Sequence, residues 1–167
     1  MDDVLDNIPR SQGSFVVIGA PGSGKTTLAQ ALARQRGLQY WSASAPMKAK
    51  FAFETVLDRE AQPAVWREAF SAYCASALRE DIRATSKLLA PSGPVVVEGF
   101  RNPVDLSHFL KAGDQVILIQ SDTEGRDPEP FATGLESCVK QVEFLAALGS
   151  VRLTRLFRSG DTYTLEL

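Results

Sequence analysis

The sequence predicts an α/β protein of three layers, with a mostly parallel sheet, helices on both faces of it, and a C-terminal hairpin. Continuous apolar runs at 15–18, 95–99 and 115–119 are typical of strands that are covered on both sides. The segments between them carry apolar residues at intervals of three and four, which is the pattern of helices packed on a sheet. Strands and helices alternate with short connections, which favours parallel pairing. Two further runs, 151–157 and 162–167, flank a turn and predict the hairpin.

The first half of the chain is expected to begin with a lead-in of little structure at residues 1–14, which are polar and contain a proline and a glycine. Glycine is placed to end the first helix, and a proline in the first turn suits the start of each of the next two. The predicted elements are a strand at 15–18, a helix that Gly37 ends, a strand at 38–42, a helix from Pro46 to Leu57, and a long helix that starts at Pro63 and extends towards Leu89.

The second half contains a strand at 95–99, a helix capped by Asn102, a strand at 115–119 and a helix at 135–148 before the hairpin. Between the last strand and the last helix, residues 121–134 are polar and contain two prolines and two glycines, so we expect a mobile loop. No internal repeat or second domain is evident. Residues 1–167 are therefore predicted to form a single domain.

The strongest motif lies at residues 15–27, FVVIGAPGSGKTT, where a strand, a glycine-rich turn and a helix follow one another. Gly19, Gly24, Lys25 and Thr26 fill the fixed positions of the phosphate-binding loop pattern. A polyphosphate must be wrapped by backbone N–H groups, and glycines let the chain turn tightly enough to do so. The loop also ends at a helix N-terminus, which favours anions. The motif therefore predicts a nucleotide site and a P-loop NTPase fold.

The predicted ligands of this loop are ATP and Mg²⁺. Lys25 would reach the β- and γ-phosphates, and the Thr26 hydroxyl would ligate the metal. A chance match in a glycine-containing turn is the alternative, and the flanking strand and helix disfavour it. The residues predicted to contact the nucleotide are Gly19, Pro21, Gly22, Ser23, Gly24, Lys25, Thr26 and Thr27.

A second group of charged residues follows the strand at 95–99, in the stretch VVVEGFRNPVD. Glu98 comes at the carboxyl end of this strand, which faces the ligand crevice in an open α/β sheet. Its carboxylate could hold Mg²⁺ through water, orient an attacking oxygen, or simply cap the turn. Arg101 is close to the same crevice and could bind a phosphate, or it could pair with Asp105 instead.

Composition and charge narrow the class of protein. With 167 residues, 44% of them hydrophobic and 23% charged, the chain is ordinary for a globular domain. The net charge of -2 gives no overall electrostatic footprint for nucleic acid, although it allows a local basic groove. Cys74 and Cys138 lack metal-binding spacing, so we expect two thiols in a reducing compartment. Because no signal peptide or membrane-length apolar run is evident, we expect a cytoplasmic protein without a membrane partner.

The sequence resembles phage-type deoxynucleoside monophosphate kinases over about residues 15–120. GAPGSGKTT resembles the phosphate loop of nucleotide kinases, residues 44–48 resemble the segment before their acceptor-site helix, and residues 95–105 resemble their strand-Asp-Asp-x-Arg-x-Pro stretch. The resemblance implies that the γ-phosphoryl group of ATP is transferred to a nucleotide-like acceptor, in the host cytoplasm if the protein is phage-encoded. It further implies that Lys48 and Arg101 are acceptor-side cations, and Glu98 replaces the usual Asp of the family.

Nucleotide kinases usually close an arginine-bearing lid over the donor phosphates. In this sequence the matching region, 121–134, is short and contains only Arg126, which is either a lid cation or a solvated loop charge. A reduced lid would leave the crevice open and would tolerate a bulky acceptor. The predicted catalytic residues are Lys25, Glu98, Arg101 and Arg126, and those predicted to bind the acceptor are Lys48, Arg101 and Asp105.

Three functions are compatible with the sequence, and the leading one is a deoxynucleoside monophosphate kinase with a small nucleotide as its acceptor. The second, by resemblance to related phage enzymes of DNA hypermodification, phosphorylates the hydroxymethyl group of 5-hydroxymethyluracil in a nucleotide or in DNA. Glu98 or Asp105 would then act as base, and the stripe Arg79, Arg83 and Lys87 could line a groove for DNA. The third is a switch or binding module that hydrolyses ATP. The sequence leaves the acceptor and the oligomeric state open.

Overall fold

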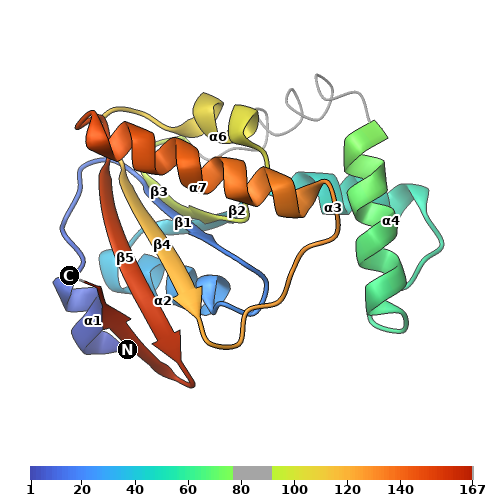
Figure 1. Ribbon diagram of the computed structural model, residues 1–167, viewed down its shortest axis with the longest axis horizontal. Coiled ribbons are helices and arrows are strands. Elements are labelled where there is room, and N and C mark those ends of the chain that lie inside the picture. Colours follow the sequence, from blue (N-terminus) through green and yellow to red (C-terminus); the bar gives the residue numbers. More distant parts are fainter. Residues whose placement is uncertain (77–91, 167) are drawn as a thin grey trace.

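The computed structural model describes residues 1–76 and 92–166 of the chain. Its centre is a six-stranded sheet in the order β2-β3-β1-β4-β5-β6 (Figure 1). The strands are β1 Phe15–Gly19, β2 Gln39–Ser42, β3 Val95–Glu98, β4 Gln115–Ser121, β5 Arg152–Ser159 and β6 Thr162–Leu165. Strands β1 to β5 are parallel to their neighbours, and β6 is antiparallel to β5, which confirms the predicted hairpin.

Strand β1 lies in the middle of the sheet, and helices cover both of its faces. All five of its residues are buried, as are all four residues of β3. Its two neighbours, β3 and β4, lie on opposite sides of it, so the connection after β1 emerges where the strand order reverses. Open α/β sheets bind their ligands at the carboxyl ends of strands at such a point.

Helices cover the two faces of the sheet and complete the three layers (Figure 1). On one face, Leu28 of α2 packs in a core with Val17 of β1. On the other face, Leu106 of α6 and Val142 of α7 share a second core with Val16. Adjacent residues of β1 thus point to opposite faces, as the period of a strand requires. The helices are α1 Asp2–Asn7, α2 Lys25–Arg36, α3 Ala45–Glu54, α4 Pro63–Ser76, α6 Pro103–Phe109 and α7 Phe131–Ala147. This architecture confirms the predicted α/β fold, that of P-loop NTPases.

The expectation of little structure at residues 1–14 is wrong, because α1 forms there and is held by the core. Leu5 and Ile8 are each only 2% exposed and belong to the core on the α2 side of the sheet. Arg36 at the end of α2 donates from Nη2 to the carbonyl oxygens of Leu5, at 2.9 Å, and of Ile8, at 2.6 Å. Tertiary contacts therefore stabilise a helix too short to form by itself.

The predicted loop 121–134 is shorter than expected. Strand β4 continues to Ser121 and α7 begins at Phe131, which leaves residues 122–130 as the connection. Gly134, which was expected in the loop, lies in the first turn of α7. A Cβ at this position would overlap the carbonyl oxygen of Arg101, so glycine here allows close packing of the helix.

Helices α3 and α4, which we call the α3–α4 unit, form a separate part of the molecule. Phe51 of α3 and Trp66 and Phe70 of α4 make a third hydrophobic cluster, distinct from the two sheet cores. In Figure 1 this unit lies beside the sheet, with α4 at one end of the molecule. Helix α4 begins at Pro63 as predicted. Its expected continuation to residue 89 lies outside the described residues, as does the stripe Arg79, Arg83 and Lys87.

Two expectations from the composition can be compared with the structure. Cys74 and Cys138 are buried in different clusters, and no disulfide joins them. None of the helices in residues 1–76 and 92–166 has the length and apolar character needed to cross a bilayer.

Candidate active site

The chain turns sharply between the end of β1 at Gly19 and the start of α2 at Lys25. Gly22 and Gly24 have φ of 77° and 86°, in the left-handed region that favours glycine. The Ser23 N–H donates to the carbonyl oxygen of Ala20 at 3.1 Å and closes the turn. Within the part of the chain that the structure describes, no side chain caps the N-terminus of α2, so its first N–H groups are available to an anion.

The C-terminal hairpin supports this loop from the side of β5 and β6. The Tyr163 hydroxyl donates to the carbonyl oxygen of Gly24 at 3.0 Å. A Cβ at Gly24 would lie 2.6 Å from that hydroxyl and would also press on Arg158. Within the loop, the Ser23 hydroxyl is fully buried and has no hydrogen-bond partner among the described residues. The loop is thus fixed in the curved form that wraps a polyphosphate, which fits the nucleotide that the motif predicts.

Lys25 opens α2 and lies among several charged groups. Burial, and next the charge of Arg101, lower the pKa of Lys25 from 10.5 to about 8, although Glu98 and Asp127 act in the opposite direction. A cation that has lost water and lies close to a second cation attracts a nearby anion strongly. The electrostatics therefore suit anionic groups close to Lys25 and Arg101.

Glu98 ends β3, is 6% exposed, and is held by a residue of the neighbouring strand. The Tyr40 hydroxyl of β2 donates to Glu98 Oε1 at 2.7 Å, and Thr26 also lies within hydrogen-bonding reach of this hydroxyl. Burial and the bond to Glu98 raise the pKa of Tyr40, so the phenol keeps its proton. Tyr40 was not among the predicted site residues. The prediction had no signal for it, since the contact depends on the pairing of β2 with β3.

Thr26 and Glu98 together fit Mg²⁺, because they present a hydroxyl and a carboxylate oxygen at the same edge of the sheet. Magnesium takes most of its ligands from phosphates and water in sites of this kind, so two protein groups are sufficient. Among residues 1–76 and 92–166, no group of three His, Cys, Asp or Glu side chains could hold a metal by itself.

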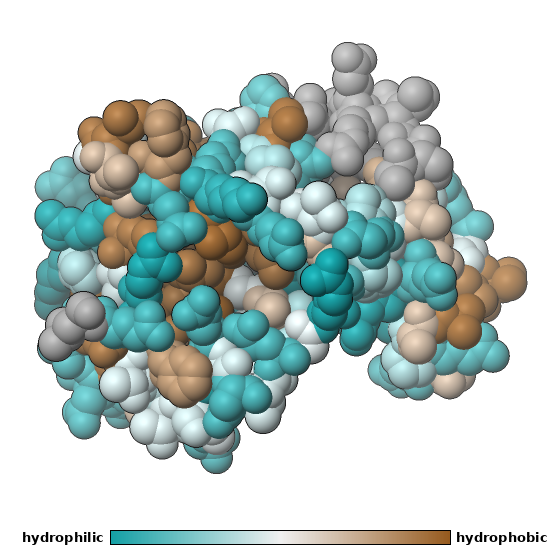
Figure 2. Space-filling view, in the orientation of Figure 1, coloured by the Kyte–Doolittle hydropathy of each residue, from teal (hydrophilic) through white to brown (hydrophobic). Residues whose placement is uncertain are grey.

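A cavity of about 1030 Å³ joins the phosphate-binding loop to the α3–α4 unit. Its lining includes Lys25 and Thr26 of the phosphate-binding loop segment, and Lys48 and Arg59. It brings together seven of the predicted site residues: Pro21, Lys25, Thr26, Lys48, Glu98, Arg101 and Asp105. Burial, and next the charge of Arg59, lower the pKa of Lys48. In Figure 2 hydrophilic residues cover much of the surface between the sheet and the α3–α4 unit.

Arg101 forms an ion pair with Asp127, through Nε and Oδ2, and not with Asp105 as considered from the sequence. Its Nη1 also donates to the carbonyl oxygen of Phe100 at 3.2 Å. Asp105 lies in the first turn of α6, where its N–H is bonded to the Asn102 side chain that caps the helix. Asp127 was missed by the sequence analysis. It lies nearly thirty positions from Arg101, and only the fold brings the two together.

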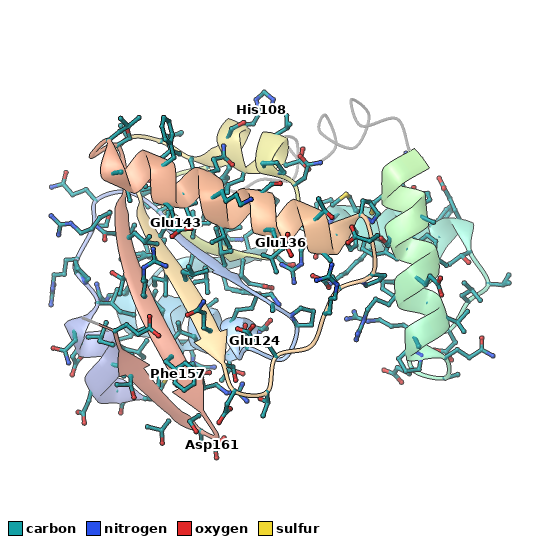
Figure 3. All side chains as sticks on the ribbon, viewed as in Figure 1. His108, Glu124, Glu136, Glu143, Phe157 and Asp161 are labelled. Carbon is teal, nitrogen blue, oxygen red and sulfur yellow. The ribbon has the colours of Figure 1, made fainter. Side chains whose placement is uncertain are left out.

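Arg126, the predicted lid cation, lies on the surface and does not line the cavity. Its side chain is 69% exposed and pairs with Glu129 at 3.1 Å and with Glu136 at 3.7 Å. Figure 3 shows Glu136 on α7, near the loop that follows β4. The predicted role of Arg126 over the donor phosphates stays a prediction. The same loop nevertheless contacts the phosphate-binding loop, because the Gly125 N–H donates to the carbonyl oxygen of Pro21 at 2.7 Å.

Comparisons with known proteins can now be set beside this geometry. A family model, ATPase family associated with various cellular activities (AAA), matches residues 15–89, just under half of the chain. No curated protein matches the sequence. A solved gluconokinase from Sinorhizobium meliloti 1021 is similar at a TM-score of 0.42 and 17% identity, over 88% of this chain and 84% of that one. A provisionally named kinase from Chloroflexus aurantiacus j-10-fl is similar at a TM-score of 0.46 and 17% identity, over 92% and 88%.

Both TM-scores lie below 0.5. The matched family segment contains β1, the glycine-rich turn and α2, which are the elements that form the phosphate site. The strand order around β1 and the left-handed glycines after it agree with that match. The chain therefore has the fold and the phosphate-binding loop of a P-loop NTPase.

Proposed function

We propose that the protein is an ATP-dependent phosphotransferase that moves the γ-phosphoryl group to a nucleotide-type acceptor, with a deoxynucleoside monophosphate as the leading candidate. One observation carries the proposal. A single cavity is lined by Lys25 of the phosphate-binding loop and by two further cations, Lys48 and Arg101. Two anionic groups could therefore meet there, each beside its own cation.

On the donor side, the residues of the chain bind and orient. The loop N–H groups and Lys25 would hold the β- and γ-phosphates and neutralise charge on the moving group. Tyr40 fixes the Glu98 carboxylate, so that Thr26 and Glu98 would hold Mg²⁺ directly and through water. Bound Mg²⁺ would stabilise the charge that develops between the phosphates.

On the acceptor side, Lys48 and Arg101 would bind and orient the acceptor phosphate, with Asp105 further along the same cavity. A phosphate acceptor is already a nucleophile, so this reaction needs little help from a base. Positioning and charge neutralisation would then account for most of the rate enhancement.

A second candidate is phosphorylation of the hydroxymethyl group of 5-hydroxymethyluracil, in a nucleotide or in DNA. Glu98 is a buried carboxylate at the cavity and could accept the proton of a hydroxyl. Arg59 and Arg67 also line the cavity, and neither forms an ion pair with another described residue. These cations favour an acceptor with more negative charge than a monophosphate.

An acceptor screen tests both candidates. The protein is incubated with Mg²⁺ and ATP labelled at the γ-phosphate, and with deoxynucleoside monophosphates, 5-hydroxymethyl nucleosides, or DNA that contains 5-hydroxymethyluracil. Label in a nucleoside diphosphate supports the leading candidate, and label in DNA or a modified nucleoside supports the second. Label that appears only as free phosphate would replace both with the ATP-hydrolysing switch.

A further inference from the structure

We propose that Asp127 is a positioning residue that holds the Arg101 guanidinium in the cavity in the orientation required for the acceptor. The inference rests on the proposed function, because it assigns Arg101 to the acceptor. Its basis is the ion pair between two well-buried side chains, with 14% of Arg101 and 9% of Asp127 exposed. A charge-assisted hydrogen bond in so little water fixes the direction of a guanidinium.

The guanidinium has capacity left for a ligand after this pairing. Its Nε bonds to Asp127 and its Nη1 to the carbonyl oxygen of Phe100. An arginine has five N–H donors, and Arg101 lines the cavity. Donors on Nη1 and Nη2 remain after these two bonds, and together they can present a pair of N–H groups to a phosphate.

The backbone of Arg101 is fixed by the same part of the chain as its side chain. Gly134 in the first turn of α7 lies so close to the carbonyl oxygen of Arg101 that a Cβ there would overlap it. Asp127 precedes this helix by only a few residues. Residues 122–134 therefore determine where Arg101 lies, although the sequence motif that predicted it is in the segment 95–105.

The loop that carries Asp127 also contacts both sides of the cavity. Towards the donor side, the Gly125 N–H bonds to Pro21 of the phosphate-binding loop. Towards the acceptor side, the Ser71 hydroxyl of α4 donates to the carbonyl oxygen of Glu129 at 2.6 Å. The ring of Phe131 packs on Phe70 with centroids 5.7 Å apart. In sequence, Asp127 lies between Gly125 and Glu129, which make these two contacts. The position of Asp127, and with it the orientation of Arg101, therefore depends on both contacts.

Asp127 could act through its charge or by positioning Arg101. The two roles predict different changes in acceptor KM and kcat when the carboxylate is removed, so kinetics can distinguish them. Asp127 lies near Lys25 and Lys48 as well as Arg101, and its removal would make the cavity more positive. If charge alone mattered, loss of the carboxylate would tighten binding of an anionic acceptor and leave kcat unchanged. If Asp127 positions Arg101, loss of the carboxylate lowers kcat because the acceptor is misplaced.

Asp127→Ala, Asp127→Asn and the control Asp122→Asn are compared in steady-state assays with the best acceptor. Asp122 lies in the same loop but is exposed. We expect Asp127→Ala to lower kcat by about 10- to 100-fold, Asp127→Asn to lower it less because its amide oxygen still accepts a hydrogen bond, and Asp122→Asn to change it little. An unchanged kcat with a lower acceptor KM in both Asp127 variants would overturn the proposal. Thermal melts verify that each variant folds.

A measurement without acceptor separates this inference from the proposed function. The Arg101 Nε–H is followed by ¹⁵N NMR, and its hydrogen exchange is compared between the native protein and Asp127→Asn. We expect slow exchange in the native protein and faster exchange in the variant. Equal exchange would overturn the positioning role even if the protein is a kinase. If exchange is slow and depends on Asp127 but the protein transfers no phosphoryl group, the ion pair is confirmed. The function proposed for Arg101 is then wrong.

Discussion

The proposed donor and acceptor sides of the cavity are built in different ways. The phosphate-binding loop lies between β1 and α2, which are buried in the sheet cores, and Tyr163 of the hairpin supports it. On the proposed acceptor side, Lys48 belongs to the α3–α4 unit, which has its own small cluster around Phe51 and Trp66. The phosphate-binding loop is therefore fixed by the body of the protein, while the position of Lys48 on the proposed acceptor side depends on how the α3–α4 unit packs.

Replacement of Lys25 should have the largest effect, because it removes the cation proposed to neutralise charge on the moving phosphoryl group. We expect Lys25→Ala to lower phosphoryl transfer by at least about 10³-fold, while the melting temperature changes little. Turnover is measured with labelled ATP, and folding by circular dichroism. Near-normal turnover would contradict the assignment of the phosphate-binding loop.

Arg101→Ala should affect the acceptor side alone. We expect acceptor KM to rise or kcat to fall, by about 10- to 100-fold in kcat/KM, while ATP affinity is retained. Equilibrium binding measures the ATP affinity, and steady-state kinetics measure the effect on the acceptor. A selective loss of ATP binding would place Arg101 on the donor side. Arg126→Ala is measured in parallel, and a loss of ATP affinity there would support its predicted role as a lid cation.

Phe70→Ala tests whether packing within the α3–α4 unit can be weakened without loss of ATP binding. Phe70 is 3% exposed and packs on Trp66, Phe51 and Phe131, so its truncation should cost about 3–5 kcal/mol of packing within the unit. We expect acceptor KM to rise while ATP affinity stays close to that of the native protein. Phe53→Ala is the matched control, because Phe53 lies on the same unit and is 93% exposed. Equal losses of ATP and acceptor binding would contradict the independence of the two sides.

The smallest expected effect is the pH dependence of nucleotide binding. Lys25 has its pKa lowered to about 8, so it is charged below this pH and progressively neutral above it. A bound phosphate favours the charged form and raises this pKa. Affinity for ADP should therefore be highest below pH 8 and fall by about tenfold or less for each pH unit above it. Calorimetry without Mg²⁺ between pH 7 and 9.5 measures this change, and a rise in affinity over that range would contradict it.

Local patterns predicted the parts of the site that depend on adjacent residues. The glycine turn before Lys25, the carboxylate at the end of β3 and the Asn102 cap each follow from a short stretch of sequence. Tyr40 and Asp127 could not be found in this way, because their partners lie 58 and 26 positions away. Their roles follow from strand pairing and from the path of the chain after β4.

Two errors in the predicted fold have the same cause, because each depends on contacts between residues far apart in the sequence. Helix α1 was missed because it is stabilised by the end of α2 rather than by its own propensity. The start of α7 was placed too late because Gly134 and two prolines are typical of loops. In the folded chain the glycine allows two backbones to approach, which is a tertiary requirement that no local pattern expresses.

The hydrogen bond from Tyr163 to Gly24 spans 139 positions of the chain. During synthesis the glycine turn leaves the ribosome long before the tyrosine that steadies it. A nascent chain that stops short of residue 163 therefore lacks this support, and nucleotide affinity should increase late in translation. Ligand binding by stalled chains of increasing length would then report when the hairpin docks.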